Sequence, residues 1–378
     1  MQITDAAKPA HSDARVAVGR LLGEAVARRA SDLHFEPTAL GYDINFRIDG
    51  LIETRQQVSP QVGQGLVNRL MVGAKLLTYR RNIPQEGRYT VPAAEAEGEA
   101  GGGVGARDLD LRVSVMPTNH GLRAAVRLPA DLRQPRRLDE LGLPEAVVSG
   151  LIEFARGDNG MLLLTGPAGS GKTTTIYALL EAIRRASEGI SIVALEDPIE
   201  RDLPGVTQVQ VTPFGELTYD RALRSMLRQD PQVLALGEIR DADTASAAVQ
   251  ASLSGHRLVS TLHAASPAGA VARLLEMGLE RYQVAGALWG VVSLRLLRRS
   301  DGKGGYRGRV PVASLGRMDD AVRSAVVAGA GLDEIQSLTE KQAGFTSFRA
   351  AAQRLVDRSE TDDDEVCRVL GGGETNGR

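Results

Sequence analysis

What most constrains the fold of this chain is the glycine-rich run G-P-A-G-S-G-K-T at residues 166–173. An apolar stretch, Met161 to Thr165, precedes the run and a helical pattern follows it, which is the context that the phosphate-binding P-loop requires. Glycines let backbone N–H groups approach phosphate oxygens, Lys172 supplies a positive charge, and the Thr173 hydroxyl can ligate Mg²⁺. An ordinary glycine-rich turn would leave Lys172 and Thr173 unexplained. The predicted phosphate-binding residues are Gly166, Gly169, Ser170, Gly171, Lys172, Thr173 and Thr174.

The region around this loop has the pattern of a parallel sheet. Short apolar runs alternate with helical stretches, at 161–165, 190–195, 233–236 and 258–262. This alternation predicts an α/β domain whose sheet is covered on both faces. Such sheets bind ligands at the carboxyl ends of their strands.

Polar clusters stand at those strand ends. The segment 237–241 places Glu238 where a P-loop enzyme holds its metal or its metal-bound water. The carboxylates of 196–200 can position an attacking water, ligate Mg²⁺ through that water, or solvate a loop. His263 ends the fourth strand, and this position favours γ-phosphate sensing or a transition-state role. His256, at the start of that strand, is equally compatible with an ordinary structural histidine.

The N-terminal part reads as a smaller α+β domain. Apolar spacing predicts a helix from Val16 to Arg29, and alternating residues predict strands near 42–48, 109–115 and 124–128. The pair Asp49-Gly50 is typical of a tight hairpin turn. We expect a disordered tail at 1–15, this domain at 16–130 with a disordered loop at 93–107 and a linker at 131–137. The α/β domain follows at 138–370 with a helical C-terminal part, and a disordered tail ends the chain at 371–378.

Composition narrows the class of partner. Lys and Arg number 45 against 47 Asp and Glu, so no net basic charge draws the chain to nucleic acid or to an anionic membrane. The one cysteine, Cys367, cannot form an intramolecular disulfide. No apolar signal segment or run of about 20 apolar residues is present, which predicts a cytoplasmic protein.

Four boxes together resemble those of the ATPases that drive type II secretion and type IV pilus assembly. They are the P-loop, 196–200, the run 223–231 leading into 237–241, and Ser254 through His263. In the smaller domain, the segments 30–37, 47–50, 84–88 and 111–114 resemble family counterparts as well. The resemblance spans about Arg15 to Leu370.

The resemblance implies a RecA-like ATPase domain after a PAS-like domain, in a hexameric ring at the cytoplasmic face of the inner membrane. It implies ATP and Mg²⁺ as cofactors and an inner-membrane platform protein as partner. Glu200 then orients the attacking water, and Glu238, with Thr173, supports the metal. Arg88 and Arg112 match arginines that reach the phosphates from the preceding domain, although strand arginines are often only surface ion pairs.

Several features depart from the family pattern. The four-cysteine zinc site of assembly-type members is missing, since 297–305 runs straight into 306–309. Because only about fifteen residues precede the first predicted helix, we also expect the additional N-terminal docking module to be absent, and Ala264-Ala265 replaces a polar pair. A retraction motor is therefore an alternative, although Arg307-Gly308-Arg309 resembles assembly members. Alternatives from other classes are a DNA-translocating ATPase and a non-motor ATP-binding regulator.

Overall fold

A computed structural model describes residues 11–93, 108–129, 137–211 and 217–371 of the chain. The chain divides into two compact units, Met1–Leu132 and Arg133–Arg378, and their boundary falls inside the linker predicted at 131–137. Apart from Ala93 and Gly371, the predicted loop 93–107 and tail 371–378 lie outside the described residues. In the part described, no helix has the length and apolar character needed to cross a membrane.

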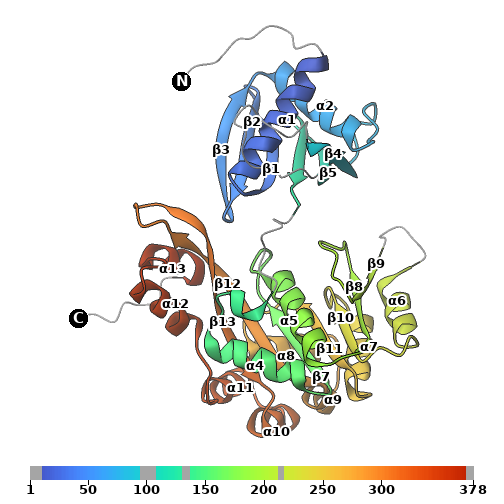
Figure 1. Cartoon of the computed structure of the whole chain (residues 1–378), viewed down its shortest axis with the longest axis vertical. Coiled ribbons are helices and arrows are strands. Elements are labelled where there is room, and N and C mark those ends of the chain that lie inside the picture. The colour runs from blue at the N-terminus through green and yellow to red at the C-terminus, as the bar shows by residue number, and fades with distance from the viewer. Residues whose placement is uncertain (1–10, 94–107, 130–136, 212–216, 372–378) are drawn as a thin grey trace. The chain divides into compact units, whose positions relative to one another are not determined.

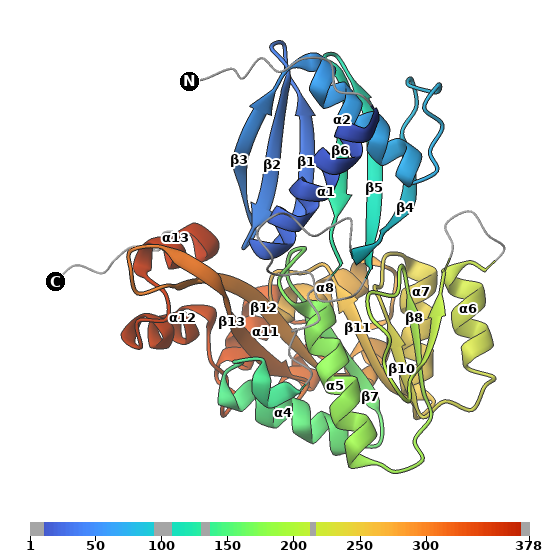
Figure 2. The same cartoon turned by 45° about the horizontal axis from the view of Figure 1, so that its top comes forward.

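The first unit is a six-stranded sheet with two helices on one of its faces (Figures 1 and 2). Its strand order is β3-β2-β1-β6-β5-β4, and every neighbouring pair is antiparallel. The elements are α1 His11–Ala27, β1 Ala30–Pro37, β2 Tyr42–Ile48, β3 Leu51–Val58, α2 Pro60–Gly73, β4 Gln85–Val91, β5 Leu109–Thr118 and β6 Gly121–Arg127.

Alternation along the strands creates the core of this unit. Ile44 and Phe46 point to the helix side and are fully buried, together with Val67 and Leu70 of α2. The predicted turn between β2 and β3 is confirmed, because Asp49 and Gly50 have φ values of 48° and 91°. A relation of this α+β unit to the PAS fold stays a prediction.

Helix α1 differs from its prediction. It begins at His11 instead of Val16 and ends at Ala27, where Arg29 follows with a φ of 60°. Residues 11–15 are mostly polar, so apolar spacing could not detect this first part of the helix. The predicted disordered tail at 1–15 is therefore wrong for residues 11–15, and residues 1–10 are outside the described part.

The second unit has a seven-stranded sheet in the order β13-β12-β7-β11-β10-β8-β9. Its central strands are parallel, as predicted, and β13 alone runs antiparallel to its neighbour. The strands are β7 Gly160–Thr165, β8 Ile192–Glu196, β9 Thr207–Gln210, β10 Val233–Leu236, β11 Arg257–Leu262, β12 Leu288–Ser300 and β13 Tyr306–Arg317.

Helices cover both faces of this sheet, as the unbroken apolar runs predict. The elements η1 Leu138–Glu140, α4 Glu145–Arg156 and α5 Lys172–Ala186 pack on one face. The other face is covered by α6 Tyr219–Met226, α7 Ala242–Leu253, α8 Pro267–Glu276, α9 Arg281–Ala287, α10 Asp320–Ala328 and α11 Leu332–Glu340.

The β12–β13 hairpin is longer than the other strands and projects past them, as Figure 1 shows. Helices α12 Phe348–Asp357 and α13 Asp363–Leu370 pack against this projection. A separate small apolar cluster joins them, in which Leu297 and Val310 of the hairpin contact Ala352 and Leu355. The hairpin therefore links the sheet to the C-terminal helices.

Candidate nucleotide-binding site

The P-loop lies between β7 and α5, as its sequence context predicts. Gly166, Gly169 and Gly171 have φ values of 141°, 73° and 94°, which L side chains rarely adopt. A Cβ at Gly166 would lie 2.4 Å from the carbonyl oxygen of Leu294, so no side chain fits there. The loop thus has the compact backbone that a phosphate-binding cradle needs.

Side chains in this loop fit a phosphate group. Lys172 donates from Nζ to the carbonyl oxygens of Gly166 and Pro167, at 2.8 and 2.9 Å. Burial lowers the pKa of Lys172, which disfavours its charged form. An anion bound in the cradle would act in the opposite direction and favour the charged form. Ser170 Oγ is buried without a hydrogen-bond partner among the described residues. A tight loop, a half-buried cation and an unsatisfied hydroxyl together suit a phosphate.

The carboxylate of Glu238 lies at the carboxyl end of β10, where the sequence places it. His263 Nε2 lies 3.0 Å from Glu238 Oε1, and Arg240 Nε donates to Glu238 Oε2 at 3.0 Å. Arg240 also lies 3.9 Å from Asp197. Lys172 is close enough to Glu238 to be affected by its charge. The fold therefore brings Lys172, Glu238 and His263 to the same edge of the sheet.

Glu196, at the end of β8, has a different environment. Its side chain is buried, it accepts a short hydrogen bond from the hydroxyl of Tyr177, and Gln208 Nε2 donates to it at 2.7 Å. Burial raises the pKa of Glu196 above its ordinary value. The same hydroxyl of Tyr177 accepts from the backbone N–H of Glu200 at 3.3 Å. Glu196 thus holds the loop on which Glu200 is exposed.

A second tyrosine connects the neighbouring strand ends. The hydroxyl of Tyr219 donates to the carbonyl oxygen of Leu195 at 3.1 Å and accepts from the backbone N–H of Glu238 at 3.2 Å. Burial raises the pKa of Tyr219 to about 12. Neither Tyr177 nor Tyr219 was predicted from the sequence, because each occupies a helical position that is typical of an ordinary core residue.

Arg88 and Arg112 belong to the first unit, where they are direct partners across β4 and β5. Arg112 Nη2 donates to Glu86 at 3.0 Å, and both side chains are about half exposed. Arg127 continues the same row on β6, opposite Arg112, and contacts Asp32 at 3.2 Å. Like charges that lie directly opposite each other on adjacent strands, as in this row, destabilise a sheet. This third arginine was missed, although alternation along β6 places it on the same face.

His256 is not part of this cluster. Its Nδ1 lies 3.0 Å from the carbonyl oxygen of Ala251, at the opposite end of β11 from His263. The structural interpretation left open for His256 therefore fits its position. Across the described ranges, no group of three or more His, Cys, Asp or Glu side chains is arranged to hold a metal ion.

A mainly parallel sheet with a P-loop after the inner strand β7 and acidic residues at the ends of β8 and β10 defines a P-loop nucleotide-binding domain of the RecA-like class. A family profile described as "Type II/IV secretion system protein" matches residues 11–368. The chain belongs to this family, as the sequence resemblance implied.

Two relatives illustrate the similarity. The type II secretion system protein HxcR of Pseudomonas aeruginosa is 36% identical over 93% of this chain and 76% of its own length. The type II secretion system ATPase E of Vibrio cholerae is 40% identical over 74% of this chain and 53% of its own length. The chain therefore spans about three quarters of the first relative and about half of the second.

Solved structures share the fold. The pilus retraction motor PilT with bound ADP aligns with a TM-score of 0.61 and 26% identity, covering 93% of this chain and 98% of PilT. The ATPase DotB of Legionella pneumophila has a TM-score of 0.72 and 20% identity, covering 95% of this chain and 96% of its own. The predicted RecA-like α/β fold is thus confirmed.

Proposed function

We propose that this chain is the ATP-hydrolysing motor subunit of a type II secretion or type IV pilus machine. The chain is a secretion ATPase by family, and the observation that supports the motor role best is the P-loop beside Glu238 and His263. Relatives of this family are named as secretion proteins and as a secretion ATPase.

ATP with Mg²⁺ is the proposed cofactor pair. Lys172 and the amides of 166–174 would hold the phosphates, and Thr173 with Glu238 would hold Mg²⁺, which supplies charge stabilisation when bound. Glu238 fits this role because His263 and Arg240 already orient its carboxylate.

Glu200 is the proposed residue that orients the attacking water. Glu196 is poorly suited to it, because its side chain is buried and is bound by Tyr177 and Gln208. Glu200 is exposed at the same strand end, and its backbone is held by Tyr177. His263 would respond to the state of the γ-phosphate through Glu238.

A hexameric ring is the proposed assembly, with Arg88 and Arg112 reaching phosphates from the smaller unit during turnover. Arg127 extends the same row and is a further candidate for this role. The ring would work at the cytoplasmic face of the inner membrane, with a platform protein as its partner. Arginines supplied from another domain typically raise turnover by about 10³ to 10⁵.

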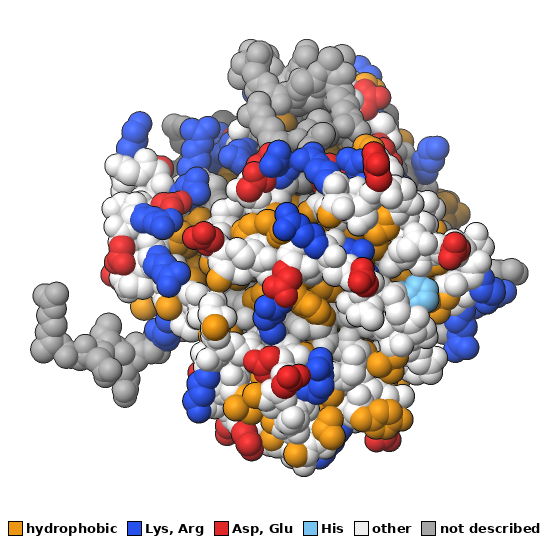
Figure 3. Space-filling view, turned by 60° about the horizontal axis from the view of Figure 1, so that its bottom comes forward, with side chains coloured by type: hydrophobic (Ala, Val, Ile, Leu, Met, Phe, Trp, Pro, Cys, Tyr) orange, Lys and Arg blue, Asp and Glu red, His pale blue; other side chains and the backbone are white. Residues whose placement is uncertain are grey.

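Pilus retraction is the second candidate function, because PilT is similar over nearly the whole chain at 26% identity. A DNA translocase is less well supported. On the face in Figure 3, acidic and basic side chains of the described residues are interspersed, in keeping with the net charge of −2. Continuous binding of a nucleic-acid backbone calls for a basic groove with aromatic platforms.

The test is an ATPase assay of the full chain over a range of protein concentrations, alone and with single-stranded DNA, lipid or a candidate platform protein. We expect specific activity to fall on dilution and Lys172→Ala to weaken ATP binding, because the phosphates lose their nearest cation. Stimulation by DNA alone would favour the translocase. Unchanged activity in a preparation that is monomeric throughout would exclude the ring.

A further inference from the structure

We propose that Arg309 is a positioning residue for the P-loop, and that helix α13 holds Arg309 in place through the β12–β13 hairpin. This inference rests on the proposed nucleotide binding and adds a part of the chain that lies outside the four boxes. In the sequence, Arg309 belongs to the run Arg307-Gly308-Arg309, which resembles assembly members of the family.

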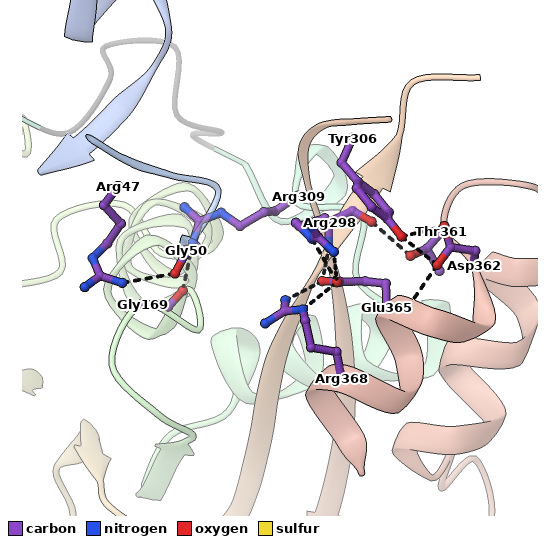
Figure 4. Close-up of polar contacts among 10 residues, drawn as sticks. All are labelled: Arg47, Gly50, Gly169, Arg298, Tyr306, Arg309, Thr361, Asp362, Glu365 and Arg368. Atoms are coloured by element: carbon purple, nitrogen blue, oxygen red, sulfur yellow. Dashed lines mark hydrogen bonds and ion pairs between the residues drawn. The ribbon is translucent and has the colours of Figure 1, made fainter. Parts of the chain in front are cut away.

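The contact that carries the proposal joins β13 to the outer bend of the P-loop. Arg309 Nη1 donates to the carbonyl oxygen of Gly169 at 3.2 Å, as Figure 4 shows. On the other side of the same peptide unit, the backbone N–H of Ser170 donates to the carbonyl oxygen of Pro167 at 3.3 Å. Because a peptide unit is planar, these two bonds fix the orientation of the whole unit.

The hairpin also supports the loop at two other points. A Cβ at Gly171 would meet the side chain of Leu296 at 3.9 Å, and a Cβ at Gly166 would meet the carbonyl oxygen of Leu294 at 2.4 Å. Both hairpin residues are in β12, opposite the strand that carries Arg309. The P-loop therefore lies against this hairpin at Gly166 and close to it at Gly171, an arrangement that would order the loop before a nucleotide arrives. Ordering a binding loop in advance lowers the entropic cost of binding.

Helix α13 fixes the same hairpin from the other side. Arg298 is the direct ladder partner of Arg309. Its backbone N–H and its Nε donate to the two carboxylate oxygens of Glu365, each at 2.8 Å. Glu365 is fully buried, and Arg368 completes its hydrogen bonds. Removing one member of a buried ion pair leaves an uncompensated charge, so the helix and the hairpin are strongly joined.

Further contacts hold helix α13 and the residues before it to the hairpin, and Figure 4 shows them grouped around Glu365. The hydroxyl of Tyr306 donates to the carboxylate of Asp362, 2.7 and 2.6 Å from its two oxygens. The Arg298 guanidinium lies 3.8 Å from the centre of the Tyr306 ring, and Thr361 Oγ1 donates to the carbonyl oxygen of Arg298 at 2.9 Å. A displacement of α13 would therefore move Arg298, and its ladder partner Arg309 would transmit that movement to the P-loop.

The first experiment compares Arg309→Ala with Arg307→Ala, an exposed arginine on the same strand. ADP affinity is measured by titration calorimetry, and amide hydrogen exchange at 166–171 is measured without nucleotide. Arg309→Ala should weaken ADP binding about threefold to tenfold, as expected for a charge-assisted but solvent-accessible hydrogen bond. It should also speed exchange at Ser170, while Arg307→Ala changes neither. Equal behaviour of the two variants would overturn the role of Arg309.

The second experiment tests the connection to α13. Glu365→Gln should weaken ADP binding in the wild-type background and have no further effect in the Arg309→Ala background. An equal loss in both backgrounds would show that Glu365 acts without Arg309, against the proposal. If thermal melting shows that Glu365→Gln does not fold, Tyr306→Phe gives the same comparison with a milder change.

Failure of this inference is distinct from failure of the proposed function. A wild-type chain that binds no ADP would overturn the proposed function, and hydrogen exchange at Ser170 would still decide whether Arg309 orders the loop. Normal ADP binding by the wild type and by Arg309→Ala, with unchanged exchange, would overturn only the inference.

Discussion

Strands β8 and β10 are parallel neighbours in the same sheet, yet the carboxylates at their ends have opposite environments. Glu196 ends β8, is buried, and is bound by Tyr177 and Gln208. Glu238 follows β10, is partly exposed, and is paired with His263 and Arg240. Two acids that look equivalent as strand-end residues therefore differ in whether they can contact a ligand.

Burial therefore distinguishes a carboxylate that holds the structure together from one that is accessible to a ligand. The buried carboxylate of Glu196 holds the backbone around it, whereas the carboxylate of Glu238, whose partners Arg240 and His263 are themselves exposed, remains accessible to a metal or a water.

Glu200→Gln should lower kcat for ATP hydrolysis by about 10² to 10⁴-fold while leaving nucleotide affinity intact, because the amide keeps the shape but cannot polarise the water. Steady-state phosphate release and binding of a fluorescent ADP analogue measure the two effects. Glu196→Gln is the matched control. If Glu196→Gln abolishes hydrolysis and Glu200→Gln does not, the roles of these carboxylates are reversed; if neither matters, Glu238 has to be the base.

Glu238→Gln should reduce activity by about 10 to 100-fold and raise the Mg²⁺ concentration needed for half-maximal rate, since loss of a residue that supports a metal usually has an effect of this size. A magnesium titration of the ATPase rate measures both quantities. His263→Ala is the comparison and should have a smaller effect on the magnesium requirement. An unchanged magnesium dependence in Glu238→Gln would remove this residue from the metal site.

Tyr177→Phe should lower the free energy of unfolding by about 1 to 3 kcal/mol, because it leaves the buried carboxylate of Glu196 without one donor. Tyr219→Phe, which loses the bond to Leu195, is the matched control and should cost about 0.5 to 1.5 kcal/mol. Urea denaturation monitored by circular dichroism gives both values. A larger loss for Tyr219→Phe would contradict the proposed importance of the Glu196 cluster.

The smallest effect concerns pH. Burial raises the pKa of Glu196 above its ordinary value of 4.5, so the folded chain holds this proton more tightly than the unfolded chain. Its contribution to stability is therefore complete below pH 4.5 and is lost as pH rises through the raised pKa. The difference in unfolding free energy between wild type and Glu196→Gln should shrink over that interval. A difference that does not vary with pH would refute the shift.

Much of the site was predictable because its signals are local. The run 166–173 contains its own glycines, lysine and threonine, and the apolar strands before 196–200 and 237–241 place those acids at one edge of the sheet. Parallel strands have their carboxyl ends at the same edge of a sheet. Because Lys172, Glu238 and His263 each come shortly after such a strand, the sequence was enough to predict that they lie at one edge. The residues that hold these groups were not predictable in the same way.

The class of domain, the P-loop and the acidic strand ends follow from the amino-acid sequence, because each depends on residues that are neighbours in the chain. Which acid is buried, and which residues support the loop, depends on contacts between distant parts of the chain. Arg309 meets Gly169 across 140 residues, and Arg298 meets Glu365 across 67. Local periodicity contains no information about contacts of such separation, since they depend on how β12, β13 and α13 pack in three dimensions.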